Sequence, residues 1–168
     1  MKKILLAAAV LLLSFSLQAQ KPGFEVGVGL PFAMNKDGAD KVKSTISVHM
    51  DGNFRIPLTR LTAGFRLGYS QFRREEMSHD FTCRTMQVLA TGSYTFTDSK
   101  LLRPYIGIGA GVAFSNNHNG LFNDGYKSDF CIASSIGVLI VKHISLSVDY
   151  SIIRKQYSHA AVRLGLAF

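Results

Sequence analysis

The sequence predicts an all-β protein, an eight-stranded antiparallel up-and-down transmembrane β-barrel that follows an N-terminal signal peptide. Three observations predict this fold. Apolar residues recur at alternate positions in eight blocks between residues 24 and 168. The connections between the blocks are mostly short and long in turn. Within each block, the bulky apolar side chains share one face, and the charged or small residues share the other.

The first 19 residues have the layout of a secretory signal peptide. Lys2 and Lys3 precede an apolar run from Ile4 to Leu13, and small and polar residues follow as far as Ala19. The run is shorter than the roughly 20 apolar residues that a transmembrane helix needs. We therefore expect export and cleavage near Ala19, with residues 20–168 forming one barrel domain.

The eight blocks are each long enough for a strand that crosses a membrane. In chain order they cover residues 24–32, 44–56, 61–72, 82–96, 103–114, 127–140, 143–153 and 161–168. The apolar faces of the first four contain Phe24, Val26, Val28 and Leu30, then Ile46, Val48 and Met50, then Leu61, Phe65 and Leu67, then Met86, Val88 and Ala90. The exception in these blocks is Leu89, an apolar residue on the polar face of the fourth.

The last four blocks repeat the pattern. Their apolar faces contain Ile106, Ile108 and Val112, then Phe130, Ile132 and Ile136, then Ile144, Leu146 and Val148, then Val162, Leu164, Leu166 and Phe168. Aromatic residues lie toward both ends of the blocks. We assign Phe54, Tyr94, Phe96, Tyr105 and Phe168 to a girdle at the short-turn end, and Phe32, Tyr69, Phe114, Phe130 and Tyr150 to one at the loop end.

The connections alternate in length. Those after the second, fourth and sixth blocks are "PLTR", "TDSKLLR" and "VK", whereas those after the first, third and fifth are "AMNKDGADKVK", "RREEMSHD" and "SNNHNGLFNDGYK". The last connection, "RKQYS", is short and departs from the rule. Short turns at one end and longer loops at the other are typical of barrels that cross an outer membrane.

The polar face would make a poor core for a soluble protein. It carries Glu25, His49, Asp51, Arg66, Asp149 and Arg163 among many glycine, serine and threonine residues. Small and charged side chains suit the narrow lumen of an eight-stranded barrel. A closed barrel also pairs every backbone polar group, as a bilayer requires. The apolar face is therefore expected to meet lipid.

Turn geometry predicts two ion pairs inside the barrel. A hairpin centred on "PLTR" places Asp51 opposite Arg66, and a turn centred on residue 156 places Asp149 opposite Arg163. We expect these four residues, with Glu25 and His49, to form an ion-pair network that plugs the lumen. Buried charges must be paired whether or not ions pass through the lumen. We therefore expect the network to have a structural role, and a gated ion path is the alternative.

The chain resembles the small eight-stranded outer-membrane β-barrels, the OmpA/OmpX-like or "porin family" proteins of Gram-negative bacteria, over residues 20–168. The tail "AVRLGLAF" is similar to their C-terminal assembly signal. The resemblance implies an outer-membrane location. It also implies that Val162, Leu164, Leu166 and Phe168 are recognised by the barrel-insertion machinery.

We expect no catalytic residue, metal or cofactor. The "HIS" segment at residues 143–145 is similar to the His-x-Ser element of outer-membrane lipid A deacylases, whose catalytic groups lie on the lipid-facing wall. Here alternation turns both side chains inward. "GIGAG" lacks the spacing of a dinucleotide fingerprint, and "NNHNGLFNDG" lacks that of a calcium loop. Cys83 and Cys131 lie on blocks separated by one strand, about 9 to 10 Å apart, so we expect no disulfide.

These observations lead us to expect a non-enzymatic outer-membrane protein with an occluded polar lumen and a structural or surface-contact role. Its partners would be the bilayer, lipopolysaccharide and, during assembly, the insertion machinery. Nucleic acid is not expected despite the net charge of +8, because the basic residues are scattered. A narrow pore is one alternative. A soluble periplasmic barrel that binds a small apolar ligand, with the two faces exchanged, is another.

Overall fold

The structure is a computed structural model, and it describes residues 22–33, 42–76, 79–119, 122–123, 125–153 and 157–168. The expected signal peptide at residues 1–19 lies outside this range. The strands are β1 (Gly23–Ala33), β2 (Val42–Arg55), β3 (Leu61–Glu76), β4 (His79–Thr95), β5 (Leu102–Asn119), β6 (Phe122–Asn123), β7 (Lys127–Ile140), β8 (Ile144–Ile152) and β9 (His159–Ala167).

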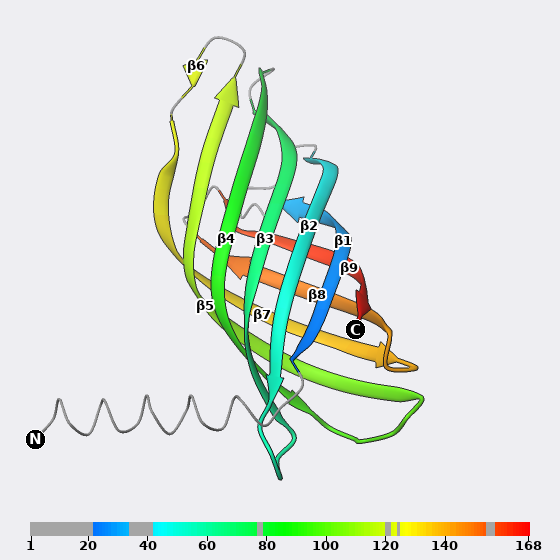
Figure 1. Ribbon diagram of the computed structural model, residues 1–168. Helices are drawn as coiled ribbons and strands as arrows, with labels where there is room; N and C mark the ends of the chain where they lie inside the picture. Colours follow the sequence, from blue (N-terminus) through cyan, green and yellow to red (C-terminus); the bar gives the residue numbers. More distant parts are fainter. Residues whose placement is uncertain (1–21, 34–41, 77–78, 120–121, 124, 154–156) are drawn as a thin grey trace, which may run out of the picture.

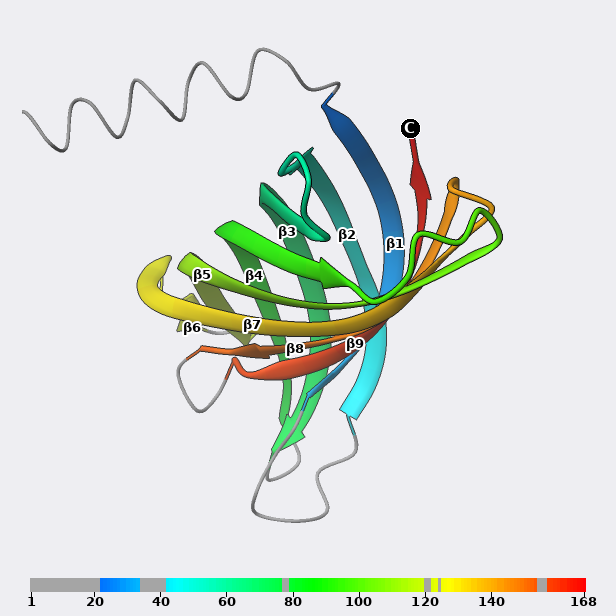
Figure 2. The ribbon, with the colours of Figure 1, turned by 90° about the horizontal axis from the view of Figure 1, so that it is seen from below.

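Eight of these strands form one closed antiparallel barrel (Figures 1 and 2). Each strand pairs with its neighbour in sequence, β9 pairs with β1, and β4 pairs with β5, which closes the wall. The two-residue β6 pairs only with the end of β5. The predicted eight-stranded barrel is confirmed.

Within the described residues, no helix has the length and apolar character needed to cross a membrane.

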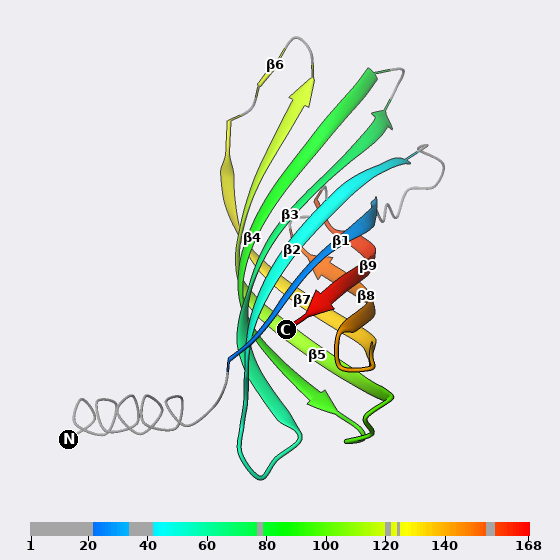
Figure 3. The same ribbon diagram turned by 45° about the vertical axis from the view of Figure 1, so that its right-hand side comes forward.

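Three strands continue past their predicted ends at the long-loop end of the barrel (Figure 3). β3, β4 and β5 have 16, 17 and 18 residues, against 9 each in β8 and β9. Much of the predicted loop "RREEMSHD" is therefore strand, with Glu75 opposite Asp80. The sequence there has no alternation of polar and apolar residues, so it did not predict a strand. The backbone pairing of β3 with β4 nevertheless continues.

The apolar face of every barrel strand points outward, as predicted. Val28 and Leu164 are 52% and 54% exposed, whereas the inward-facing Asp149 and Arg163 are 1% and 3% exposed. The exposed apolar side chains form a continuous band around the barrel, here called the apolar belt: Val26, Val28, Leu30, Val48, Met50, Phe65, Leu67, Met86, Val88, Ile106, Ile108, Val112, Ile132, Ile136, Leu146, Val148, Val162 and Leu164. This orientation is the reverse of what a soluble barrel with an apolar interior would require.

The assignment of five aromatic residues to the short-turn girdle is wrong for Tyr105. Tyr94 and Phe96 are exposed at the short-turn end and make an edge-to-face contact at 5.4 Å between ring centroids. Tyr105, however, faces the lumen, because the neighbouring Pro104 and Ile106 point outward. Its ring lies over Gly137, where a Cβ atom would come within 2.7 Å of the phenol.

Candidate functional site

The charged residues of the lumen meet in one cluster near the middle of the barrel. They come from β1, β2, β3, β8 and β9, which are far apart in sequence but lie around the same interior. The cluster, here called the lumen network, consists of Glu25, His49, Asp51, Arg66, Asp149 and Arg163, and ion pairs of 2.7 to 3.4 Å link its members. The structure thus brings together all six residues that the sequence analysis named.

Arg66 is the centre of the lumen network. It lies opposite Asp51 in the β2–β3 register, as predicted. Its Nε and NH2 groups donate to the two carboxylate oxygens of Asp51, each at 2.8 Å, and its NH1 donates to Asp149 at 2.7 Å. A planar guanidinium suits such two-pronged contacts. Arg66 therefore links β3 to β2 and, across the lumen, to β8.

The predicted register of Asp149 and Arg163 is wrong. Asp149 lies opposite Ala161, and Arg163 lies opposite Ser147. The β8–β9 connection is centred on residue 155 instead of 156, which shifts the pairing by two residues and leaves both side chains on the inner face. The ion pair still forms along the diagonal, with 3.3 Å between Arg163 Nε and Asp149 Oδ2.

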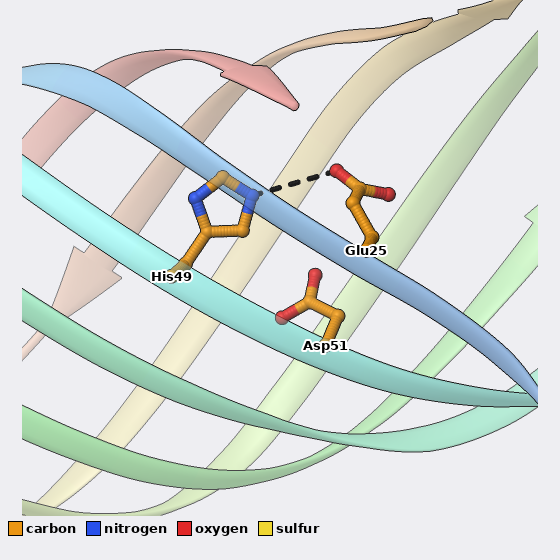
Figure 4. Close-up of side chains that lie close together, drawn as sticks. All are labelled: Glu25, His49 and Asp51. Atoms are coloured by element: carbon orange, nitrogen blue, oxygen red, sulfur yellow. Dashed lines mark hydrogen bonds and ion pairs between the residues drawn. The ribbon is translucent and has the colours of Figure 1, made fainter. Parts of the chain in front are cut away.

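Glu25 and His49 form a second part of the lumen network, beside Asp51. Glu25 Oε1 lies 3.4 Å from His49 Nε2 and accepts a hydrogen bond from the Ser145 hydroxyl. Figure 4 shows the carboxylates of Glu25 and Asp51 and the imidazole of His49 converging from two neighbouring strands. One ligand atom from each of the three lies within 4.8 Å of the others.

Glycine residues give this part of the network its room. A Cβ atom on Gly27 would lie 2.4 Å from the His49 ring and 2.5 Å from the Leu164 carbonyl oxygen. A Cβ atom on Gly165 would lie 2.6 Å from Glu25 Oε1. The small residues that alternate with the apolar belt are therefore necessary for the charged side chains to fit inside.

Two serines of β8 complete the network and had no assigned role. Ser145 binds Glu25, and the Ser147 hydroxyl donates to Asp149 Oδ2 at 3.0 Å. Alternation places both inside the barrel. The partner of Ser147 is its neighbour on the same face of β8, whereas the partner of Ser145 depends on how β8 sits against β1, which is distant in sequence.

A cavity of about 260 Å³, here called the vestibule, extends from the lumen network to the short-turn end. Glu25, Asp51 and Arg66 line its inner part, while Arg55, Asp98, Arg103 and Lys142 lie toward its mouth. Its walls carry hydroxyl groups, among them Thr62, Thr91, Ser93, Thr95, Tyr105 and Ser135. The network is thus accessible to small polar species from this end.

A cluster of buried apolar side chains lies toward the long-loop end of the lumen, beside the buried polar side chains of Thr85, Ser115 and His159. This apolar plug consists of Phe72, Cys83, Leu89, Ala113, Cys131, Ala133, Ile153 and Tyr157. Leu89 belongs to it because the register aligns Arg66, Leu89, Gly111 and Cys131 in one row across β3, β4, β5 and β7. Cys83 and Cys131 are both buried and are not joined by a disulfide, as expected.

The other residues named from the sequence lie apart from this interior. Val162, Leu164, Leu166 and Phe168, which the resemblance assigns to assembly, all point outward and are exposed. His143 lies in the turn between β7 and β8, with Nδ1 at 3.1 Å from the Ala167 carbonyl oxygen.

The barrel closure, the outward apolar belt and the charged lumen together define the fold of the small eight-stranded outer-membrane β-barrels, as the resemblance predicted. The Neisserial surface protein A, NspA, superimposes with a TM-score of 0.61 at 15% identity, over 87% of this chain and 95% of NspA. Ail, the attachment invasion locus protein of Yersinia pestis, superimposes with a TM-score of 0.52 at 15% identity, over 88% of this chain and 97% of Ail. The outer membrane enzyme PagL superimposes with a TM-score of 0.51 at 16% identity, over 87% of this chain and 98% of PagL.

Neither a scan against protein-family models nor a search of curated proteins finds a match to the sequence. At these levels of identity, the likeness to the solved structures concerns the fold.

Proposed function

We propose that the protein is a non-enzymatic outer-membrane barrel with a closed lumen, which contributes to envelope structure or to contact at the cell surface. The observation that carries this proposal is the combination of a continuous apolar belt outside with a paired, buried charge network inside. Such a surface is unsuited to water and suited to lipid.

The connections at the two ends of the barrel support one orientation of the protein in the membrane. The short connections at residues 56–60, 96–101 and 141–143 lie at the same end as the start of β1 and the end of β9 (Figure 1). Outer-membrane barrels place short turns in the periplasm and long loops outside. The vestibule would therefore open to the periplasm, and the apolar plug would lie toward the cell exterior.

Two barriers in series support a closed lumen. The lumen network crosses the barrel at its middle, and the apolar plug lies beyond it, toward the long-loop end. A hydrated ion would have to separate Arg66 from two carboxylates and then pass between Phe72, Leu89 and Tyr157. The alternative of a narrow pore has no comparable support.

The long strands β3, β4 and β5 support a surface role, because they carry polar residues beyond the apolar belt. The outward-facing Arg73 and Arg84 are exposed in this region. Guanidinium groups at this level would meet the phosphates of lipopolysaccharide. The printed names of NspA, a surface protein, and Ail, an attachment protein, agree with such a role but concern those proteins.

The position of Ser145 supports the non-enzymatic part of the proposal. Its hydroxyl is 2% exposed, faces the lumen and is bound to Glu25. A serine in this position does not reach lipid on the outer wall. His143 lies in the β7–β8 connection, at the opposite end of the barrel from the long loops.

Electrical recording in planar bilayers tests the proposal. The refolded protein should produce no stable single-channel steps under conditions where an established porin, used as the positive control, conducts. Folding is verified by faster migration of the unboiled protein on SDS gels. Regular steps whose size changes in an Asp149→Asn variant would contradict the closed lumen and support the narrow pore.

A further inference from the structure

Glu25, His49 and Asp51, three members of the lumen network, also offer a set of metal-ligand atoms. Imidazole nitrogen and carboxylate oxygen are the ligands that Zn²⁺ and related ions take from proteins. All three side chains converge from β1 and β2, with their nearest ligand atoms within 4.8 Å of one another (Figure 4).

His49 and Glu25 form a long hydrogen bond whose separation also matches that of two ligands of one ion. His49 Nε2 and Glu25 Oε1 are 3.4 Å apart, longer than the usual 2.9 to 3.0 Å of an N–H···O bond. Two ligands of a tetrahedral ion with bonds of 2.0 to 2.1 Å are separated by about 3.3 to 3.4 Å. This pair could therefore share an ion without a large movement.

Asp51 could complete the ligand set by a modest shift. Both of its oxygens accept from Arg66, but each carboxylate oxygen has a second lone pair. One oxygen could thus bind an ion while Arg66 retains the other. A shift of at most about 1.5 Å would bring it to ligand distance from the pair above.

The charge of the lumen network favours a cation. It contains the carboxylates of Glu25, Asp51 and Asp149 but only the guanidinium groups of Arg66 and Arg163, so one negative charge is in excess when His49 is neutral. The vestibule, which Glu25 and Asp51 line, gives small ions a route from the short-turn end.

Several buried polar atoms near the cluster lack a hydrogen-bond partner among the described residues, and they include His49 Nδ1 and both polar atoms of the Gln87 side chain. His49, Gly68 and Gln87 lie side by side in one row of the register, and Gln87 Oε1 reaches over Gly68. Metal-bound histidines usually donate their second N–H to such an acceptor. Gln87, which is 2% exposed, is the acceptor available in this row.

We propose that Glu25, His49 and Asp51 bind one divalent transition-metal ion of the Zn²⁺ class, with its remaining coordination position open to the vestibule. The ion would join β1 to β2 inside the barrel. This inference goes beyond the closed-lumen proposal and does not depend on it, because metal binding and conductance are measured separately.

Zinc titration of the untagged, refolded barrel in detergent tests the site. We expect one Zn²⁺ per barrel by calorimetry, and affinity at least about tenfold lower in His49→Ala and in Glu25→Gln. The matched control is His143→Ala, which removes a histidine from the exposed turn and should leave the affinity unchanged. Cys83 and Cys131 are present in every variant, so they cannot account for a difference.

A second measurement keeps the test independent of small losses in stability. Co²⁺ added to the wild-type barrel should give the visible absorption of a tetrahedral site, and this band should be absent in Glu25→Gln, provided its unboiled gel migration shows a folded barrel. Equal Zn²⁺ affinity in the wild type and His49→Ala would overturn the proposal. Loss of binding in His143→Ala would do so as well, because it would place the ion at the turn.

Discussion

At the residue scale, Asp149 is the side chain on which both lumen arginines depend. It accepts from Arg66 NH1 and Ser147, and it lies 3.3 Å from Arg163 Nε. With 1% of Asp149 exposed, water cannot replace it. Removing one partner of a buried ion pair leaves the other charge uncompensated. This usually lowers the stability of the fold far more than replacing the whole pair by apolar residues does.

Asp149→Ala should therefore lower the free energy of unfolding by about 3 to 5 kcal/mol. Urea titration of the protein refolded in detergent measures this value. The control is Asp98→Ala, which removes an exposed partner of Arg55 at the short-turn end and should cost less than about 1 kcal/mol. An unchanged urea midpoint for Asp149→Ala would show that the lumen network does not hold the barrel together.

The glycines beside His49 offer a matched pair of substitutions. Gly27 and Gly68 lie on either side of His49 in the register. A Cβ atom on Gly27 would come within 2.5 Å of the backbone oxygen of Leu164, whereas on Gly68 its nearest neighbour, in Gln87, would be 3.6 Å away.

Gly27→Ala should destabilise the barrel by about 1 to 3 kcal/mol, because the backbone must shift to relieve the overlap. Gly68→Ala should be close to neutral, since the added methyl group has ordinary contacts. The two urea midpoints, compared in the same detergent, measure the difference. Equal midpoints would mean that space beside His49 is not limiting.

At the scale of single elements, the turn between β7 and β8 carries backbone strain. Val141 and Lys142 have φ values of 50° and 66°, and His143 N donates to the Ile140 carbonyl oxygen at 3.1 Å. Positive φ values at both central residues of the four-residue turn 140–143 define a turn type that Asn-Gly adopts readily. A β-branched residue such as valine rarely adopts this conformation.

Replacing both residues, as Val141→Asn with Lys142→Gly, should stabilise the protein by about 1 to 2 kcal/mol. Thermal unfolding, followed by the loss of fast gel migration, detects this as a higher transition temperature. Lys100→Gly in the neighbouring connection is the control, because Lys100 has no positive φ to relieve and should not gain stability. A lower transition temperature for the double variant would show that the turn is not strained.

At the scale of the whole molecule, the apolar belt is the feature that distinguishes a membrane-spanning barrel from a soluble one. Val28 lies midway along β1, between the outward-facing Phe24 and Phe32, and is 52% exposed. In water an arginine here would be harmless. At the middle of a bilayer it would lose its hydration.

Val28→Arg should cost about 2 to 4 kcal/mol when the protein is folded in phospholipid vesicles. The measurement is the urea midpoint in vesicles. The control, Ile56→Arg, places the same charge in a short turn and should cost no more than about 1 kcal/mol. If Val28→Arg proved as harmless as the control, lipid would not cover this face.

Much of this architecture follows from local pattern. Alternation at Val26, Val28 and Leu30, repeated in all eight blocks, determined the strands, their number and the face that each side chain occupies, because neighbouring side chains of a strand always point to opposite sides. The same rule identified all six residues of the lumen network. It failed in β3, β4 and β5 beyond the apolar belt, where polar residues on both faces remove the signal.

Only the tertiary structure decided which inward residues meet. The shift of Arg163 from Asp149 to Ser147, the place of Leu89 in the apolar plug and the convergence of Glu25, His49 and Asp51 all depend on register between strands. Register is set by turn geometry and by closure of the barrel around β9 and β1. Alternation predicts which face of the sheet a side chain occupies, but not its position along the barrel axis. These charged side chains meet because they occupy similar positions along that axis.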